Sequence, residues 1–182
     1  TDDHKPLADK IRPNIFDDVV GHTEILGLEG PIGRMIKDEN YKSFVMWGPP
    51  GVGKTTIARI IGKSKKIDYF ELSAIFTTVS ELRKIFAEAK SRKIECNKRT
   101  LLFIDEIHRF NKSQQDAFLP VIEDGTIVLV GSTTENPSFA LNSALLSRVF
   151  IVNMGKLSRE NLGLLIKKVE HRLGFKMPLT KA

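Results

Sequence analysis

Of the 182 residues, 41% are hydrophobic and 27% are charged, a composition typical of a globular protein with a packed core. No apolar run approaches the roughly 18 residues of a membrane-spanning helix, and the first residues lack an apolar stretch, so we expect neither a membrane span nor a secretory signal. The single cysteine, Cys96, excludes an internal disulfide and favours a reducing compartment.

Most of the net positive charge lies in residues 151–182. The formal net charge is +6, and residues 151–182 alone carry seven Lys or Arg and two acidic residues. A basic helix of this kind usually has a solvated face, and alternatively it contacts a nucleic-acid backbone. Charge alone therefore does not predict nucleic-acid binding.

The apolar pattern predicts alternating helices and strands. The apolar runs are continuous rather than alternating, which is typical of strands covered on both faces. Such an order favours an α/β fold whose parallel sheet has helices on its flanks. In chain order we predict a helix over 25–36, strands over 44–47 and 68–72, a helix capped by Ser80, a strand over 101–104, a helix over 117–122, and strands over 127–130 and 149–152.

A last helix is predicted after the fifth strand. Ser158 is a candidate N-cap, and Gly174 a candidate end. Because its apolar face needs a packing partner, we interpret this helix as the first element of a smaller second domain. The predicted boundaries are 1–154 for the α/β domain and 155–182 for that first helix.

The first apolar strand leads into a glycine-rich loop, GPPGVGKT, that matches the pattern G-x-x-x-x-G-K-S/T. The glycines allow backbone N–H groups to curl around a triphosphate, and the helix that follows favours an anion at its N-terminus. Lys54 is expected to bridge the β and γ phosphates of ATP, and the Thr55 hydroxyl to bind Mg²⁺. The predicted nucleotide-binding residues are Gly48, Pro49, Pro50, Gly51, Val52, Gly53, Lys54, Thr55 and Thr56.

The third strand ends in two carboxylates, Asp105 and Glu106, about fifty residues after the loop. Because ligands bind at the carboxyl ends of parallel strands, Asp105 is expected to orient Mg²⁺. Glu106 is expected to be the general base that polarises the attacking water, and the alternative is a surface acid that caps the next helix. His108 lacks a second ligand at metal-binding spacing, so we expect it to have a structural or positioning role.

Two further positions are candidates for contact with the γ-phosphate. The fourth strand leads into Thr133 and Thr134, and we favour Thr134 as the residue that positions the water, with a turn role as the alternative. Arg148 follows a short helix. It is either a surface arginine in a salt bridge or a finger that reaches the site of a neighbouring subunit.

Together, the segments GPPGVGKT, LLFIDEIHRFNKSQQDAFL, GSTTENPSF and ALLSR resemble the AAA+ ATPase superfamily. More narrowly, they resemble the replication-associated recombination protein A family, to which the eukaryotic Werner-helicase-interacting ATPase is related. The resemblance implies a P-loop core with a five-stranded parallel sheet, a helical lid that begins near residue 155, and hydrolysis of ATP with Mg²⁺. It also implies that Arg148 is the finger in trans, and it places an adenine pocket at Pro6, Leu7, Arg12, Pro13, Val20 and Gly21.

The same resemblance implies a biological role. Members are expected to form homo-oligomers, as tetramers or hexamers, and to have an ATPase that DNA stimulates at stalled or gapped replication forks. Expected partners are single-stranded or forked DNA, single-stranded-DNA-binding protein and the replisome, without a membrane. The expected location is the bacterial cytoplasm at the nucleoid, or the nucleus in a eukaryote.

Three residues depart from the family pattern, namely His22, Ser132 where an alanine is usual, and Val149. None of them removes a catalytic group. Two alternatives remain beside the leading hypothesis. One is a clamp-loader-like or branch-migration subunit, which shares the same core. The other is a nucleotide-gated binding module that does not hydrolyse ATP, although Lys54, Asp105 and Glu106 are all present.

Overall fold

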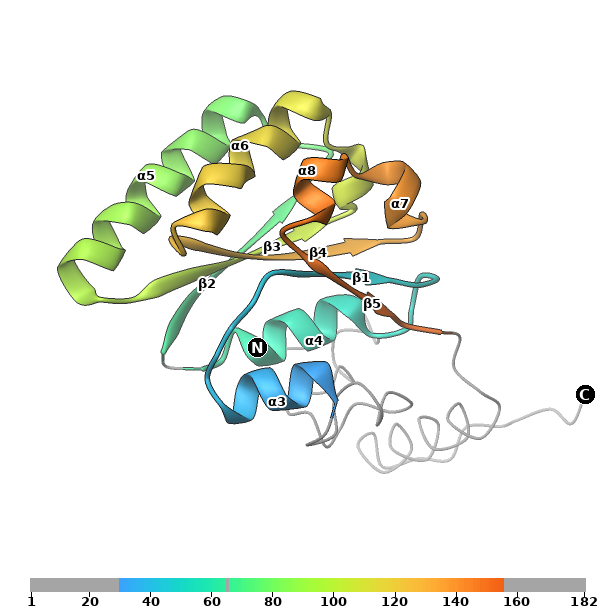
Figure 1. The fold of residues 1–182 in the computed structure, drawn as a ribbon, viewed down its shortest axis with the longest axis horizontal. Helices are drawn as coiled ribbons and strands as arrows, with labels where there is room; N and C mark the ends of the chain where they lie inside the picture. The colour runs from blue at the N-terminus through green and yellow to red at the C-terminus, as the bar shows by residue number, and fades with distance from the viewer. Residues whose placement is uncertain (1–29, 65, 156–182) are drawn as a thin grey trace, which may run out of the picture.

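A five-stranded parallel sheet forms the middle layer of the structure, a computed structural model that describes residues 30–64 and 66–155 (Figure 1). The strand order is β2-β3-β4-β1-β5. The parallel sheet and the five predicted strands are confirmed, with shifts at most of the strand ends. The strands are β1 (Phe44–Trp47), β2 (Ile67–Ser73), β3 (Arg99–Asp105), β4 (Ile127–Thr133) and β5 (Phe150–Asn153).

Helices cover both faces of the sheet, as Figure 1 shows. One face carries α3 (Pro31–Lys37) and α4 (Lys54–Ile61). The other carries α5 (Val79–Cys96), the 3₁₀ helix η2 (Ile107–Arg109), α6 (Lys112–Glu123), α7 (Pro137–Ala140) and α8 (Ser143–Leu146). Of the helices that the structure describes, none has the length and apolar character needed to cross a membrane.

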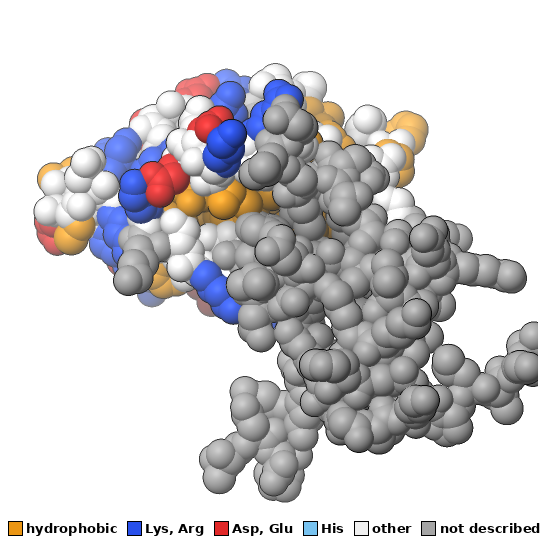
Figure 2. All heavy atoms as spheres, turned by 90° about the horizontal axis from the view of Figure 1, so that it is seen from below, with side chains coloured by type: hydrophobic (Ala, Val, Ile, Leu, Met, Phe, Trp, Pro, Cys, Tyr) orange, Lys and Arg blue, Asp and Glu red, His pale blue; other side chains and the backbone are white. Residues whose placement is uncertain are grey.

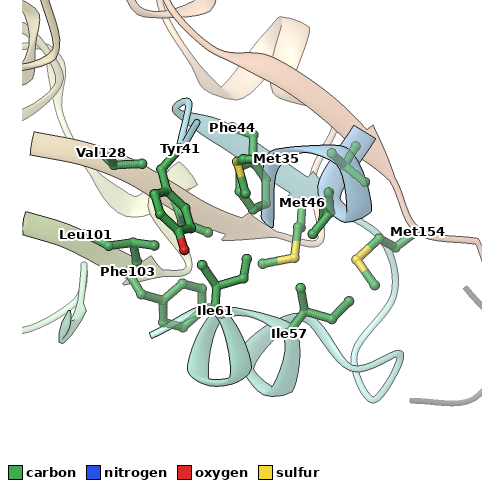
Figure 3. Close-up of a cluster of buried hydrophobic side chains, with 14 of the residues drawn as sticks. Met35, Tyr41, Phe44, Met46, Ile57, Ile61, Leu101, Phe103, Val128 and Met154 are labelled. Carbon is green, nitrogen blue, oxygen red and sulfur yellow. The ribbon is translucent and has the colours of Figure 1, made fainter. Parts of the chain in front are cut away.

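Alternate residues of each strand face opposite layers of the core. Leu101 and Phe103 of β3 point toward α4 and belong to one buried cluster (Figure 3), whereas Leu102 and Ile104 belong to the cluster under α5 and α6. The side-chain period of two residues continues to the strand ends. It therefore decides which layer each residue at the carboxyl edge faces, and Asp105 shares the face of α4.

The fourth strand is longer than its apolar run predicts. The run ends at Val130, but β4 continues to Thr133, because each residue from Val130 to Thr133 pairs with one residue of β1. Pairing on both sides of a central strand satisfies its backbone whatever the side chains are. The small and polar residues at the end of β4 are therefore part of the sheet, and all are buried.

One predicted helix lies partly, and another wholly, outside the described residues. The pattern over 25–36 corresponds to α3, which starts at Pro31, a residue favoured in the first turn because it needs no hydrogen bond for its missing N–H. Residues 25–29 and the predicted last helix, with Ser158 and Gly174, lie outside the described part of the chain.

The predicted N-cap of α5 is wrong by two residues. Thr78, not Ser80, is the cap, with an extended backbone that lets its hydroxyl accept a hydrogen bond from Glu81 N at 3.2 Å. The Glu81 carboxylate accepts one in return from Thr78 N at 2.7 Å. This reciprocal capping box needs a Glu three residues after the cap, a spacing that Thr78 satisfies and Ser80 does not.

We predict that Thr78→Ala lowers the free energy of unfolding by about 1 kcal/mol, since the first turn of α5 loses its cap. Ser80→Ala is the matched control, because Ser80 is an exposed residue inside the first turn and should change stability by only a few tenths of a kcal/mol. Urea unfolding followed by circular dichroism measures both. Equal losses in the two variants would contradict the capping assignment.

Candidate functional site

The glycine-rich loop joins the end of β1 to the start of α4. Gly51 and Gly53 have φ values of +80° and +102°, a region that residues with a side chain rarely adopt. A side chain at either position would meet no atom within 4 Å, so the glycines are required by the backbone conformation rather than by crowding. Backbone amides curled in this way form a concave site for an anion.

Gly48 is required for a different reason. A Cβ atom at this position would lie 2.1 Å from the carbonyl oxygen of Met154, which follows β5. Gly48 N also donates to the carbonyl of Thr133 on β4 at 3.1 Å, and Met154 N donates to that of Trp47 at 2.7 Å. The start of the loop is therefore fixed between β4 and β5.

Lys54, the first residue of α4, folds back onto the loop. Its Nζ donates to the carbonyl oxygens of Gly48 at 2.5 Å and Pro49 at 2.9 Å. Partial burial lowers the pKa of Lys54 below its ordinary value, and the negative charge of Asp105 opposes that shift. A phosphate would exchange with these two carbonyls as the partner of the ammonium group, and its charge would favour the protonated form.

The first turn of α4 contributes the two threonines of the motif. Thr55 is partly buried and Thr56 is buried. The N–H groups of a helix N-terminus attract anions, so the predicted placement of a polyphosphate agrees with the start of α4.

Asp105 and Glu106 lie where β3 meets η2. Asp105 is the last residue of the strand, and its Oδ1 accepts a hydrogen bond from Glu106 N at 3.1 Å. Glu106 has a left-handed backbone (φ 54°, ψ 46°), which for a residue other than glycine costs on the order of 1 kcal/mol. It precedes η2 as the N-cap, yet its side chain makes no capping hydrogen bond. The alternative interpretation, in which Glu106 serves to cap the next helix, therefore does not account for its carboxylate.

His108 and Thr133 connect η2 to the end of β4. The Nδ1 atom of His108 lies 2.9 Å from Thr133 Oγ1, and Thr133 is buried. Thr133 Oγ1 also accepts a hydrogen bond from Glu135 N at 3.0 Å. These contacts agree with a positioning role for His108. Thr134, the first residue after β4, is exposed, so it is the more accessible of the two threonines, and its contact with the γ-phosphate stays a prediction.

Gln115 is a residue whose importance the sequence did not reveal. It is 5% exposed, and its Nε2 donates to the carbonyls of Phe110 at 3.0 Å and Ala140 at 3.3 Å. Its Oε1 accepts a hydrogen bond from Asn142 N at 2.8 Å. Gln115 thus joins the loop after β3 to the loop after β4. Two successive glutamines in an amphipathic helix were the available signal.

Arg148 follows α8 and pairs with the last residue of α6. Its Nε donates to Glu123 Oε1 at 2.8 Å, and its guanidinium also donates to the Ala144 carbonyl at 2.7 Å. Within the single chain this is the surface salt bridge that was the alternative interpretation. The predicted contact with a neighbouring subunit stays a prediction.

The sheet brings the loop and the carboxylates to one edge. The parallel strands β1, β3 and β4 are adjacent, so the loop, Asp105, Glu106 and Thr134 all follow strand ends on the same side. Arg148 lies apart from this group, beside α6. The predicted adenine-pocket residues lie outside the described part of the chain, namely Pro6, Leu7, Arg12, Pro13, Val20 and Gly21.

The available donor atoms fit Mg²⁺ held mainly by a nucleotide. Thr55 offers a hydroxyl and Asp105 a carboxylate, which are the hard oxygen donors that this ion prefers. In residues 30–64 and 66–155 no group of three or more His, Cys, Asp and Glu side chains is placed to hold a metal. Mg²⁺ at nucleotide sites usually takes one or two protein ligands together with phosphate and water oxygens, so a larger cluster is not required.

The charged side chains on the face seen in Figure 2 are of mixed sign. Lys and Arg lie beside Asp and Glu over the visible described residues. On that face the described residues therefore do not by themselves mark a surface for a polyanion.

Two known proteins are similar in sequence to most of this chain. Replication-associated recombination protein A of Escherichia coli (strain K12) is 46% identical over 158 residues, which are 87% of this chain and 35% of that protein. ATPase WRNIP1 of Dictyostelium discoideum is 43% identical over 163 residues, covering 90% of this chain and 18% of that protein. The chain thus spans about a third or less of the length of these relatives.

Solved structures show the same fold. The Thermotoga maritima RuvB Holliday junction branch migration motor superposes with a TM-score of 0.69 at 27% identity, over 91% of this chain and 55% of that one. The model of the ATPase family associated with various cellular activities (AAA) matches residues 44–155, which contain the loop, both carboxylates and Arg148. Because that match covers more than half of the chain, the chain belongs to the AAA family of ATPases.

Proposed function

We propose that this chain binds ATP with Mg²⁺ and hydrolyses it. The observation that carries the proposal is the common edge of the sheet, where the curled loop follows β1 and the Asp105–Glu106 pair follows β3. Gly51 and Gly53 turn the loop, and Lys54 is the cation beside it.

Each residue has a role that follows from its chemistry. Lys54 exchanges its two carbonyl partners for phosphate oxygens, and Thr55 and Asp105 hold Mg²⁺, which supplies charge stabilisation to the phosphates when bound. Glu106 accepts the proton of the attacking water, and its left-handed backbone is the local strain expected of a residue held for function. Thr134 orients that water from the end of β4.

We also propose that the full-length protein acts on DNA in replication and recombination, as a homo-oligomer at stalled or gapped forks. The names and the 46% identity of the bacterial relatives support this role, together with the DNA motor RuvB as a structural neighbour. In such an assembly Arg148 leaves Glu123 and reaches the nucleotide of the next subunit, and residues 155–182 begin a helical lid. Single-stranded-DNA-binding protein and replisome components are the proposed partners.

A branch-migration motor is the second candidate. The superposition on RuvB favours it, but the identity to RuvB is 27%, against 46% to replication-associated recombination protein A. A four-way junction and a gapped fork, given to the same preparation, separate the two. The leading proposal expects the larger stimulation of ATP hydrolysis from the fork.

Lys54→Ala should weaken binding of ATP by roughly a hundredfold, since charge-assisted hydrogen bonds to phosphate are lost. Lys66→Ala is the matched control, because Lys66 pairs with Glu39 on the surface and should leave affinity unchanged. Isothermal titration calorimetry with ATP and Mg²⁺ measures both. Unchanged affinity in the Lys54 variant would exclude the loop as the phosphate site.

Glu106→Gln should keep the affinity for ATP and lower the turnover rate by about 10²- to 10⁴-fold, because the amide cannot accept the proton. Glu88→Gln is the control, since Glu88 is an exposed carboxylate of α5, away from the loop and the Asp105–Glu106 pair. Phosphate release in a single turnover reports the chemical step. A rate equal to that of the unmodified protein would remove Glu106 from the mechanism.

Arg148→Ala in the full-length protein should leave binding of ATP by each subunit intact and abolish the DNA-stimulated rate. Mixing it with the Glu106→Gln variant should restore part of that rate, because an intact Arg148 then faces an intact site. Arg109→Ala, at an exposed arginine of η2, controls for loss of a surface charge. No recovery in the mixture would contradict the finger in trans, and no response of the unmodified protein to DNA would contradict the role in DNA transactions.

A further inference from the structure

Ser132 lies on β4 beside the end of β3. The paired register of these strands runs as far as Ile104 and Gly131, so the next residues, Asp105 and Ser132, are neighbours across the sheet. By the alternation of each strand, both side chains face the layer of α4, as do Phe103 and Val130. Ser132 is 1% exposed. Most hydroxyls buried to this extent have a hydrogen-bond partner.

The partner of that hydroxyl is the Asp105 carboxylate. Ser132 Oγ donates to Asp105 Oδ1 at 2.5 Å, and the same oxygen accepts from Glu106 N at 3.1 Å. An ionised carboxylate only accepts hydrogen bonds, so the serine is the donor. Across residues 30–64 and 66–155, the other oxygen, Oδ2, accepts no hydrogen bond. The two donors thus use one oxygen and leave the other for a ligand.

We propose that Ser132 is a positioning residue that orients Asp105 for Mg²⁺, an inference that rests on the proposed binding of ATP with this ion. By fixing the carboxylate, the hydroxyl removes rotational freedom that metal binding would otherwise have to remove.

A purely structural role for this serine predicts different contacts. Ser43 is a buried serine directly before β1, at the amino ends of the strands. Its hydroxyl accepts a hydrogen bond from the backbone N–H of Leu129 at 2.9 Å and so gives a backbone group of β4 its partner. Ser132 instead bonds the side chain that is the candidate metal ligand. Loss of the Ser43 hydroxyl should alter stability alone, whereas loss of the Ser132 hydroxyl should alter the requirement for the metal.

The test compares Ser132→Ala with Ser43→Ala in the full-length protein. Binding of a fluorescent ATP analogue is measured in EDTA and then along a titration with Mg²⁺. We expect Ser132→Ala to raise the half-saturating Mg²⁺ concentration about three- to tenfold, since one orienting hydrogen bond is lost and one remains. Affinity in EDTA should stay the same, and kcat at saturating Mg²⁺ should stay close to that of the unmodified protein. Ser43→Ala should show the unmodified Mg²⁺ dependence.

The outcomes separate this inference from the proposed function. If the unmodified protein binds the analogue without any dependence on Mg²⁺, or does not bind it, both the function and the inference are wrong. If the unmodified protein depends on Mg²⁺ and Ser132→Ala has the same half-saturation, the inference alone is wrong. Equal weakening of binding with and without the metal would also overturn it, and a melting temperature measured in EDTA confirms that each variant is folded.

Discussion

The structure depends on one constraint, the parallel pairing of β3, β4 and β1 in adjacent positions. Parallel strands end at the same edge, so the chain must place there the three segments that follow them. The period of two along each strand then chooses the layer, and it sets Asp105 on the side of α4, the helix that continues the glycine-rich loop. The glycine-rich loop and Asp105 lie at the same edge of the sheet because of strand order, although about fifty residues separate them in the chain.

The paired strands also precede one backbone conformation that residues with a side chain rarely adopt. Glu106 has positive φ and directly follows β3, a strand that is paired on both sides, whereas Gly51 and Gly53 adopt positive φ at little cost because they have no Cβ atom. Strain of this kind persists where the surroundings determine the geometry. At Gly48 the restraint is steric as well, because the carbonyl of Met154 leaves no room for a Cβ atom.

Buried polar side chains connect the loops around the site. His108 contacts Thr133, and Gln115 spans the loops after β3 and β4. At its other end the same helix, α6, presents Glu123 to Arg148. Helix α6 thus contacts both the segment that follows the Asp105–Glu106 pair and Arg148.

The sequence by itself determined the fold class, the five strands, the loop and the carboxylate pair. Continuous apolar runs and a glycine pattern can be recognised within a short segment, because strands covered on both faces need apolar residues throughout and positive φ favours glycine. The N-cap at Thr78 was also encoded locally, by the glutamate three residues later, and was simply assigned to the wrong residue. Ends of strands were less predictable, since β4 extends through polar residues only because β1 pairs with them.

Only the tertiary structure decided which side chains meet. The bond of Ser132 to Asp105, the contact of His108 with Thr133, and the pairing of Arg148 with Glu123 each join residues 25 or more positions apart. Their partners follow from strand register and helix packing, which one sequence specifies only through the whole fold. The exposure of Thr134 and the burial of Thr133 have the same origin, because they depend on where the pairing of β4 with β1 stops.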